Sequence, residues 1–301
     1  MKIPDAVASA IGDAAQRPFL LQHATPVGGG DINQTFRLEG TDGSRYFLKL
    51  NAAHHHGIPS TWLRTGFVAE AAGLQAIAAT QTLRVPQVIA HGTSEGINFL
   101  VLEYLQLGVR GDARRLGEQL AALHRNTANR FGFPQDNFIG STPQPNGWAD
   151  DWLDFWRERR LGFQLQLAAQ NGYGGELQRQ GEKLMDALPE FFAGYTPQPS
   201  LLHGDLWGGN HGFLADGTPT VFDPAAYYGD RECDLAMTEL FGGYPAEFYA
   251  AYQTAWPLDN GHEKRRDLYN LYHILNHANL FGGSYVSQAL QLCQRLALRH
   301  S

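Results

Sequence analysis

The chain has 301 residues, which is long enough for one large domain or for two lobes that each bury a core. Hydrophobic residues make up 43% of the chain and charged residues 18%, a balance typical of ordinary soluble globular proteins. Its 23 basic and 30 acidic residues give a net charge of −7, which argues against a nucleic-acid-binding protein but not against a nucleotide-binding one.

The N-terminal third reads as a small β-rich region. A short helix is expected over residues 4–16. Three strands of an antiparallel meander should follow it, at residues 19–27, 32–38 and 45–50. The glycines 28–30 form the first turn of this meander, and Asp42-Gly43 is a strong signal for the second.

The following segments extend this region. A polar loop over residues 51–61 contains the His triplet 54–56, which we interpret as solvated rather than as a metal site. A helix is expected over residues 61–79. Two further strands are expected at residues 85–90 and 98–104. The turn between them is assigned to residues 91–96.

Beyond residue 105 the pattern becomes helical. Helices are expected at residues 112–125, 148–170 and 176–192. Only the segment 201–222, with short apolar runs between polar loops, interrupts this pattern. The sequence therefore predicts an α+β, bilobal fold, with a β-rich nucleotide-binding lobe at 1–104 and a mainly helical lobe at 105–301.

The cysteines and the N-terminus predict a cytoplasmic protein. No apolar run approaches the length of a membrane span, and residues 1–16 carry acidic side chains that a signal peptide lacks. Cys233 and Cys293 are too few for a disulfide framework and do not have the spacing of a metal site.

The octapeptide HGDLWGGN at 203–210 carries the strongest chemical signal. Asp205 precedes Asn210 by five residues, and Asp223 follows Asn210 by thirteen. In phosphoryl transfer to a hydroxyl, one Asp accepts the hydroxyl proton, and an Asn and a second Asp hold Mg²⁺ against the ATP phosphates. A single Asp in a loop is usually a cap or turn residue. Three such groups at this spacing favour the catalytic interpretation.

Several residues of the β-rich region suit a bound nucleotide. Gly28, Gly29 and Gly30 allow backbone amides to approach phosphate oxygens, although a glycine run is also typical of an ordinary tight turn. Lys49 stands at the end of a predicted strand and can reach the phosphates. Glu70, in the middle of the next predicted helix, can pair with Lys49 and fix its amine.

The segment 99–105 joins the two predicted lobes. As an extended connector, Glu103, Tyr104 and Leu105 can offer backbone N–H and C=O groups to the edge of an adenine. An ordinary buried strand is an equally good interpretation of the same residues. The change from strands to helices at this point favours the connector.

Three residues in and near the octapeptide carry separate expectations. We interpret His203 as a core imidazole that is hydrogen-bonded to the backbone. Trp207 stands where many protein kinases carry a Lys. Its indole cannot neutralise a phosphate, but it can stack on a small polar substrate such as a sugar. Asp234, in a helix expected over 232–240, should brace the catalytic loop through hydrogen bonds.

The chain resembles the fructosamine kinase (ketosamine kinase) family, which has the protein-kinase-like, aminoglycoside-phosphotransferase-like fold. The resemblance covers nearly the whole chain and includes FLKLN at 47–51 and LVLEYL at 100–105. Its specific parts are HGDLWGGN at 203–210 and FDPAAYYGDRE at 222–232. The general kinase elements would not separate this family from aminoglycoside or choline kinases.

This resemblance implies ATP- and Mg²⁺-dependent phosphorylation of a sugar hydroxyl on glycated amines, with release of the free amine from the unstable product. The implied roles are base for Asp205, metal ligand for Asn210 and Asp223, phosphate binding for Lys49 and Glu70, and adenine binding for Glu103, Tyr104 and Leu105. Some members carry a loop cysteine that allows redox-controlled, strand-exchanged dimers. This chain has no cysteine there, so we expect no such regulation, and a monomer is the expected state.

Two rival functions remain open from the sequence. The first is a kinase of the same fold that acts on an aminoglycoside, choline or another small alcohol. The second is a nucleotide-binding regulator without catalysis, although such proteins usually lose one of the catalytic groups that are all present here. A protein kinase is disfavoured because the segment after Asp223 is short. The sequence leaves the sugar and the carrier amine open.

Overall fold

The computed structural model describes residues 3–28, 33–52 and 60–298, with side chains in the last range from residue 65 onward. An antiparallel five-stranded sheet forms the N-terminal part, in the order β1-β2-β3-β5-β4. Its strands are β1 (Leu21–Pro26), β2 (Gln34–Gly40), β3 (Arg45–Ala52), β4 (Val88–Ser94) and β5 (Ile97–Glu103). The predicted meander of the first three strands is confirmed.

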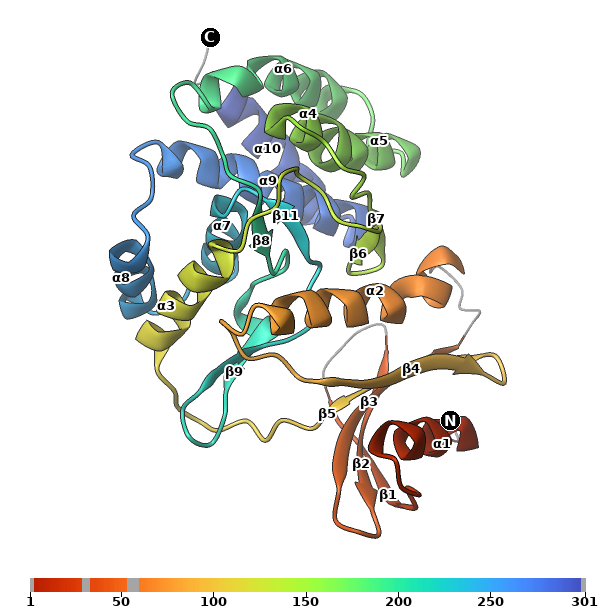
Figure 1. Cartoon of the computed structure of the whole chain (residues 1–301). Coiled ribbons are helices and arrows are strands. Elements are labelled where there is room, and N and C mark those ends of the chain that lie inside the picture. The colour runs from red at the N-terminus through yellow and green to blue at the C-terminus, as the bar shows by residue number, and fades with distance from the viewer. Residues whose placement is uncertain (1–2, 29–32, 53–59, 299–301) are drawn as a thin grey trace.

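Two helices cover the faces of this sheet (Figure 1). Helix α1 (Asp5–Ala15) packs on one face, where its Val7 and Ile11 form a core with strand residues. Helix α2 (Ser60–Ala79) lies on the other side, between the sheet and the rest of the molecule. Side chains on a strand point alternately to opposite faces. Leu48 and Leu50 of β3 therefore join the α1 core, and Lys49 between them faces α2 and the helical part.

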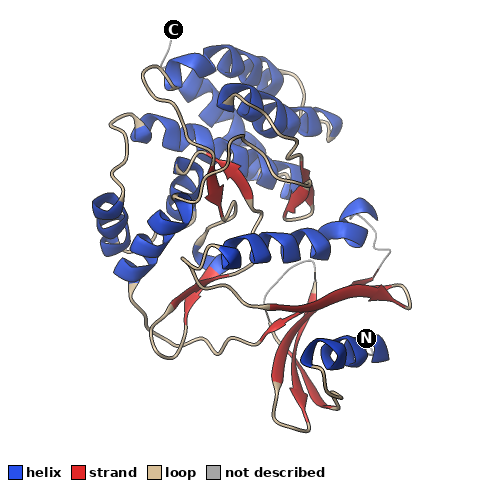
Figure 2. Cartoon of the chain, viewed as in Figure 1, coloured by secondary structure: helices blue, strands red, loops and turns tan. Residues whose placement is uncertain are grey.

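The remainder of the chain is mainly helical (Figure 2). Its α-helices are α3 (Ala113–His124), α4 (Trp152–Trp156), α5 (Phe163–Gln170), α6 (Glu176–Phe191), α7 (Glu232–Leu240), α8 (Ala246–Ala255), α9 (His262–Phe281) and α10 (Ser284–Leu298). Helix α9 is central, and its buried face joins a large core that also includes residues of α2 and β5.

Three small two-stranded ladders lie between the sheet and the helices. The pairs are β6 (Asn137–Ile139) with β7 (Thr142–Gln144), β8 (Ser200–Leu202) with β11 (Tyr227–Gly229), and β9 (His211–Phe213) with β10 (Pro219–Val221). Strand β10 is also tied to the N-terminal part, because the carbonyl oxygen of Arg84 accepts hydrogen bonds from Val221 N and Thr220 Oγ1.

The structure corrects three of the predicted elements. Strand β4 continues to Ser94, so the predicted turn over 91–96 is too long. Glu95 and Gly96 alone make the turn, both with positive φ. The helix predicted over 148–170 begins at Trp152, after Asp151 caps it by accepting from Asp154 N, and a π-helical turn at Arg157–Gly162 divides it.

The third correction concerns the interruption of the helical part. The prediction placed it only at 201–222, whereas β6, β7 and β11 lie outside that range. Strands of three residues are too short to show an alternating pattern.

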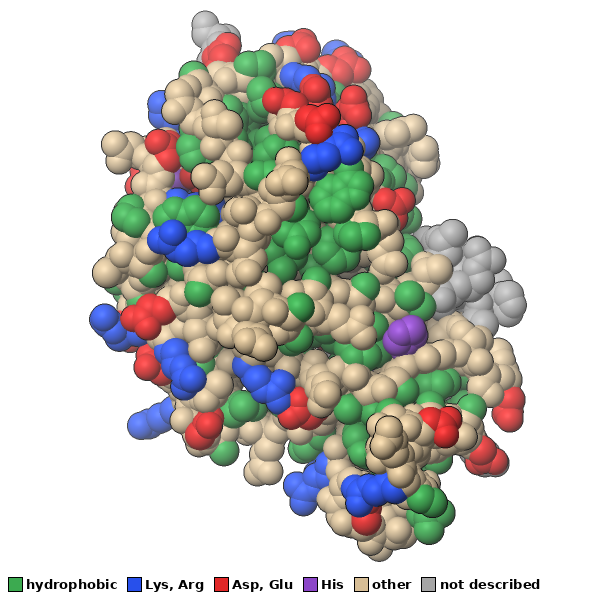
Figure 3. All heavy atoms as spheres, viewed as in Figure 1, with side chains coloured by type: hydrophobic (Ala, Val, Ile, Leu, Met, Phe, Trp, Pro, Cys, Tyr) green, Lys and Arg blue, Asp and Glu red, His purple; other side chains and the backbone are tan. Residues whose placement is uncertain are grey.

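On the face shown in Figure 3, basic and acidic side chains are interspersed. No helix in the described part of the chain is long and apolar enough to cross a membrane.

Candidate active site

Lys49 is the centre of a buried ion-pair cluster between the sheet and the helical part. Its Nζ lies 2.8 Å from Glu70 Oε1 on α2 and 2.6 Å from Asp223 Oδ1. Burial by itself would lower the pKa of the Lys49 ammonium, but the charges of Asp223 and Glu70 raise it. Burial raises the pKa of Glu70 to about 7 against the opposing effect of Lys49. The predicted pairing of Lys49 with Glu70 is thus present.

The segment that follows β8 is held by Asp234 of α7. Its two carboxylate oxygens accept hydrogen bonds from the backbone N–H groups of His203 (2.7 Å) and Gly204 (2.8 Å). Burial opposes ionisation of Asp234, but the hydrogen bond with His124 lowers the pKa of the carboxyl. Asp234 therefore braces the loop as predicted.

His203 is fully buried and lies beside the segment that carries Asp223. Its Nε2 is 3.0 Å from the carbonyl oxygen of Phe222, and Ala225 N donates to the carbonyl oxygen of His203. Burial lowers the pKa of the His203 imidazole, which keeps the ring neutral. The prediction of a core imidazole bonded to backbone is confirmed. Gly204 allows this packing, because its φ is +83° and a Cβ would lie 2.1 Å from the Ala225 carbonyl oxygen.

Asp205 and Asn210 are neighbours across the turn that the octapeptide makes. Asn210 Nδ2 donates to the carbonyl oxygen of Asp205 at 2.9 Å and to its Oδ2 at 3.1 Å. Burial raises the pKa of the Asp205 carboxyl to about 7, and the negative charge of Asp223 adds to the shift. A cation near these carboxylates would favour the ionised form of Asp205.

Asp223 follows β10, as the sequence predicted, and has a left-handed backbone conformation with φ of +58°. Left-handed conformations are uncommon outside glycine, but Asp tolerates them better than most residues. Phe222 N donates to the carbonyl oxygen of Asn210 at 3.1 Å, so the segments that carry Asn210 and Asp223 lie side by side. The Asp223 side chain is 46% exposed and faces the cavity.

These residues line one cavity of about 920 Å³ between the sheet and the helical part. Its wall includes these residues of the predicted site: Gly28, Lys49, Glu70, Glu103, Tyr104, Leu105, Asp205, Trp207, Asn210 and Asp223. Gly29 and Gly30 lie outside the described residues. A volume of this size is typical of sites for small molecules and cofactors.

The end of β5 and the connector that follows it line this cavity. The Glu103 carboxylate is held by the Arg84 guanidinium and by Gln87 N, which donates at 3.1 Å. The Glu103 carboxylate therefore interacts with Arg84 and Gln87, which precede β4. Tyr104 and Leu105 follow the end of β5 along the cavity wall.

Trp207 lies at the edge of the cavity with 40% of its surface exposed. Its carbonyl oxygen accepts a hydrogen bond from Tyr244 Oη at 3.2 Å, and its indole covers Gly209. A Cβ on Gly209 would lie 2.2 to 2.7 Å from three indole carbons, whereas one on Gly208 would meet no atom within 4 Å. Gly209 therefore leaves room for the indole.

The sequence reasoning missed several residues that line the cavity. In and next to the sheet these are Asn33, Thr35 and Phe47, and from the ladder β6–β7 they are Asn137 and Phe138. Phe47 and Thr35 could have been predicted from the position of Lys49. Phe47 shares a strand face with Lys49, and Thr35 pairs with Lys49 across β2 and β3. Asn137 and Phe138 had none, because the ladder itself was not predicted.

Asn210 and Asp223 suit a hard divalent cation. Mg²⁺ prefers oxygen ligands and is usually held by one or two carboxylates together with substrate phosphates. Oδ1 of the Asn210 side chain and the Asp223 carboxylate provide such oxygens. They lie beside Asp205, whose pKa is raised. Within the described ranges, no group of three or more His, Cys, Asp or Glu side chains forms a metal site by itself.

Known proteins are similar to this chain over nearly its whole length. The family model described as fructosamine kinase matches residues 4–299. A probable ketoamine kinase of Synechocystis is 47% identical over 294 residues, covering 96% of this chain and 95% of the relative. The chloroplastic protein-ribulosamine 3-kinase of rice is 38% identical, covering 95% and 84% of the two chains.

A solved structure shows the same fold. The crystal structure of a putative fructosamine-3-kinase from Haemophilus somnus superposes with a TM-score of 0.86 at 29% identity, covering 96% of each chain. The bilobal, kinase-like α+β class predicted from the sequence is thereby confirmed. On the family match over nearly the whole chain and the relatives at 38–47% identity, this chain belongs to the fructosamine kinase family.

Proposed function

We propose that this protein is an ATP-dependent kinase that phosphorylates a sugar hydroxyl of ketosamines. The observation that carries the proposal is the convergence of Lys49, Asp205, Asn210 and Asp223 on one cavity beside the connector. The names of the relatives, ketoamine kinase and ribulosamine 3-kinase, support a ketosamine as the acceptor.

Asp205 is the proposed base. Its carboxylate would accept the proton of the sugar hydroxyl while that oxygen bonds to the γ-phosphorus and the bond from the γ-phosphorus to the bridging oxygen of ADP breaks. The hydrogen bond from Asn210 Nδ2 holds the Asp205 carboxyl in place. Fixing base and hydroxyl in one geometry supplies much of the rate acceleration in phosphoryl transfer.

The other residues bind the nucleotide in this proposal. Asn210 and Asp223 would hold Mg²⁺, which when bound neutralises the charge that develops on the phosphates. Lys49, fixed by Glu70, would contact the α- and β-phosphates. Gly28 and its neighbours Gly29 and Gly30 would cover the phosphates. The backbone of 103–105 would bind the adenine edge.

Trp207 is the proposed platform for the sugar. Its half-exposed indole borders the cavity close to Asp205, where an aromatic face can pack against the C–H groups of a sugar ring. Phosphorylation of the sugar on a glycated amine would give an unstable phosphate that releases the free amine, so the physiological role would be deglycation.

An acceptor panel tests this proposal. ATP consumption in the presence of Mg²⁺ is measured with fructose-lysine, ribulose-lysine, kanamycin and choline. Turnover with the two ketosamines and none with kanamycin or choline is the expected result, and the position of the new phosphate on the sugar is read by NMR. Asp205→Ala should lower kcat by about 10²–10⁴-fold, the range for a lost general base. Near-normal turnover in that variant would sink the assignment of Asp205.

Four further expectations remain proposals. They are the division of the chain into a nucleotide-binding lobe at 1–104 and a helical lobe at 105–301, a monomeric state, a location in the cytoplasm, and the absence of redox regulation through the glycine loop.

A further inference from the structure

A series of hydrogen-bonded side chains crosses the N-terminal sheet and ends in the cavity. Thr93 Oγ1 on β4 donates to Asn98 Oδ1 on β5 at 2.6 Å. Asn98 Nδ2 donates to Asn51 Oδ1 on β3 at 2.9 Å. Asn51 Nδ2 donates to Asn33 Oδ1 at 3.2 Å, and Asn33 directly precedes β2. The series therefore connects β4, at the edge of the sheet, with a residue of the cavity wall.

The two middle members of this series are buried. Asn51 is 6% exposed and Asn98 is 3% exposed. Asn is depleted in strands, and burying an amide costs free energy unless its hydrogen bonds are made. Apolar residues at these two positions would fill the sheet without that cost. Polar residues that a fold does not need for packing are candidates for holding another group in position.

The direction of the three bonds is the same throughout. In each of them an N–H or O–H group donates toward the next residue, and the Oδ1 of that residue accepts. The Oδ1 of Asn33 is thus used by Asn51. Within the described part of the chain no group accepts a hydrogen bond from Asn33 Nδ2, so its two N–H groups are available to the cavity, which the half-buried Asn33 lines. The sheet presents a hydrogen-bond donor to the bound ligand at this point.

The position of Asn51 on β3 indicates which part of the ligand this donor meets. Phe47, Lys49 and Asn51 share one face of the strand, and successive members are about 6.5–7 Å apart along it. Phe47 pairs with Leu102, next to the connector, whereas Asn51 pairs with Asn98 at the far end of the strand. If adenine lies at the connector and the α- and β-phosphates lie at Lys49, the γ-phosphoryl group would lie near Asn51, the next residue on this face of the strand.

We propose that Asn33 Nδ2 donates a hydrogen bond to a γ-phosphoryl oxygen of bound ATP, and that Asn51 is the positioning residue that aims it. The inference rests on the proposed ATP-dependent function and adds a contact to the group that is transferred. Because ADP lacks this group, the contact discriminates between substrate and product nucleotide. A donor on a phosphoryl oxygen also offsets the negative charge that the reaction spreads over these oxygens.

Binding of two nucleotides separates this contact from a general effect. Calorimetric titrations with Mg²⁺ and either ADP or the β,γ-imido analogue of ATP are made on the unmodified protein, on Asn33→Ala and on Gln34→Ala. In Asn33→Ala the triphosphate analogue should bind about 10-fold more weakly or worse, the range for one lost hydrogen bond to a charged group. ADP binding should stay unchanged. Gln34 is exposed and adjacent, so Gln34→Ala should change neither affinity.

The second variant tests the positioning role. Asn51→Ala leaves Asn33 in place but removes the donor that fixes its amide. We expect a smaller loss for the triphosphate analogue and unchanged ADP affinity, with a melting curve that shows the variant is folded. An equal loss for both nucleotides in either variant would mean a structural role only and would overturn the proposal.

Two further results bear on the assignment. Unchanged affinity for both nucleotides in Asn33→Ala would overturn the contact between Asn33 and the γ-phosphoryl group. A rise confined to the KM of the sugar acceptor in the same variant would also overturn it, because the Asn33 amide would then bind the sugar. Failure of the proposed function looks different. In that case Asn33→Ala would still bind the triphosphate analogue more weakly than the unmodified protein does, but the unmodified protein would phosphorylate no ketosamine.

Discussion

Lys49 Nζ lies 2.6 Å from Asp223 Oδ1, although 174 positions separate the two residues in the chain. The contact joins the proposed phosphate-binding cation of the sheet to the proposed metal ligand of the helical part. A bound cation and phosphates would compete for both partners. Asp223 would then turn to the metal, and Lys49 would keep Glu70 while it takes a phosphate.

We first predict unequal effects at the two ends of the Lys49–Glu70 pair. Lys49→Met should weaken ATP binding by about 10- to 150-fold, because it removes hydrogen bonds between charged groups. Glu70→Gln keeps the Lys49 ammonium itself and removes only the charge of its partner on α2, so it should weaken ATP binding less. Nucleotide affinity with Mg²⁺ present is the measurement. Larger losses in Glu70→Gln than in Lys49→Met would contradict the assigned roles.

We next predict that Asp223 carries the Mg²⁺ dependence of nucleotide binding. A ligand that binds only the folded state stabilises it by RT ln(1 + [L]/Kd), so at a fixed ligand concentration the melting temperature rises more for a tighter ligand. ATP should raise the melting temperature of the unmodified protein more with Mg²⁺ than with EDTA. In Asp223→Asn this extra rise should be lost, because a neutral amide binds the cation less strongly than a carboxylate. A full Mg²⁺ effect in that variant would remove Asp223 from the metal site.

The two glycines of the octapeptide provide a matched pair of variants. Gly209→Ala places a methyl group within 2.7 Å of the Trp207 indole and must displace the ring, whereas Gly208→Ala meets open space. Gly209→Ala should therefore raise the KM for a ketosamine by about 10-fold, which corresponds to a loss of about 1.4 kcal/mol in the free energy of binding. Gly208→Ala should leave it near normal, and ATP affinity should hold in both. Equal KM values would show that Trp207 does not contact the acceptor.

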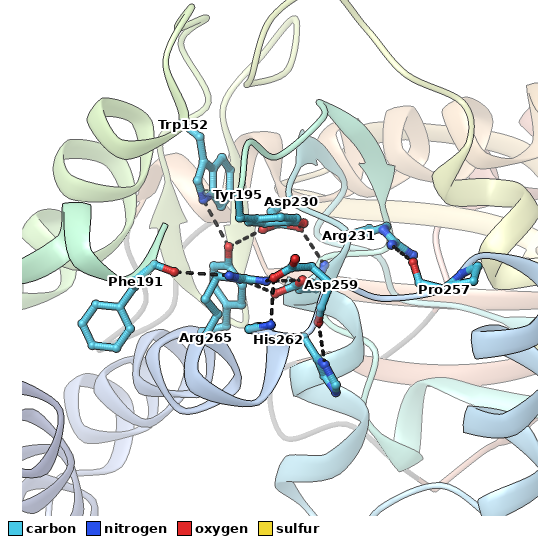
Figure 4. Close-up of polar contacts among 12 residues, drawn as sticks. Trp152, Phe191, Tyr195, Asp230, Arg231, Pro257, Asp259, His262 and Arg265 are labelled. Carbon is cyan, nitrogen blue, oxygen red and sulfur yellow. Dashed lines mark hydrogen bonds and ion pairs between the residues drawn. The ribbon is translucent and has the colours of Figure 1, made fainter. Parts of the chain in front are cut away.

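A buried cluster around Asp230, Glu232 and Arg265 predicts how the stability of the protein depends on pH. Asp230 and Arg265 are labelled in Figure 4. Asp230 accepts hydrogen bonds from Tyr195 Oη at 3.0 Å and Glu232 N at 3.0 Å, and also from Tyr269 Oη. Burial raises the pKa of Asp230 to about 7, and the charge of Glu232 adds to this. Arg265 binds both oxygens of Glu232 in the same cluster.

The sign of this dependence follows from proton linkage. Between about pH 4 and 7 the folded protein keeps a proton on Asp230 that the unfolded chain has released, so the contribution of Asp230 to stability falls as pH rises. Urea unfolding at several pH values measures this. Asp230→Asn cannot titrate and should show a flatter decline across the window than the parent. A parallel decline in both proteins would assign the pH dependence to other groups.

The sequence was sufficient for the residues that spacing or alternation identifies. Asp205, Asn210 and Asp223 stood out by their spacing, and Lys49 stood out as a cation at the end of a predicted strand with Glu70 on the next helix. The structure brings all of them to one cavity. Their catalytic and metal-binding roles stay predictions.

Contacts that depend on register between distant strands could not be predicted. The pairing of Thr93 with Asn98 requires a two-residue turn at Glu95 and Gly96. A turn drawn over 91–96 excludes Thr93 from the sheet, and with it the side-chain series that ends at Asn33. The proximity of Lys49 to Asp223 was equally hidden, because it depends on how the sheet packs against the helical part.

The tie between Arg84 and β10 has a mechanical consequence. The two hydrogen bonds from Val221 and Thr220 to the Arg84 carbonyl oxygen fix the sheet region to the helical region within three residues of Asp223. In any rotation that opens the cavity, points close to such an anchor travel least and points far from it travel most. Asp223 lies close to this anchor along the chain, so it should move less than cavity residues that lie far from the anchor as nucleotide and acceptor enter and leave.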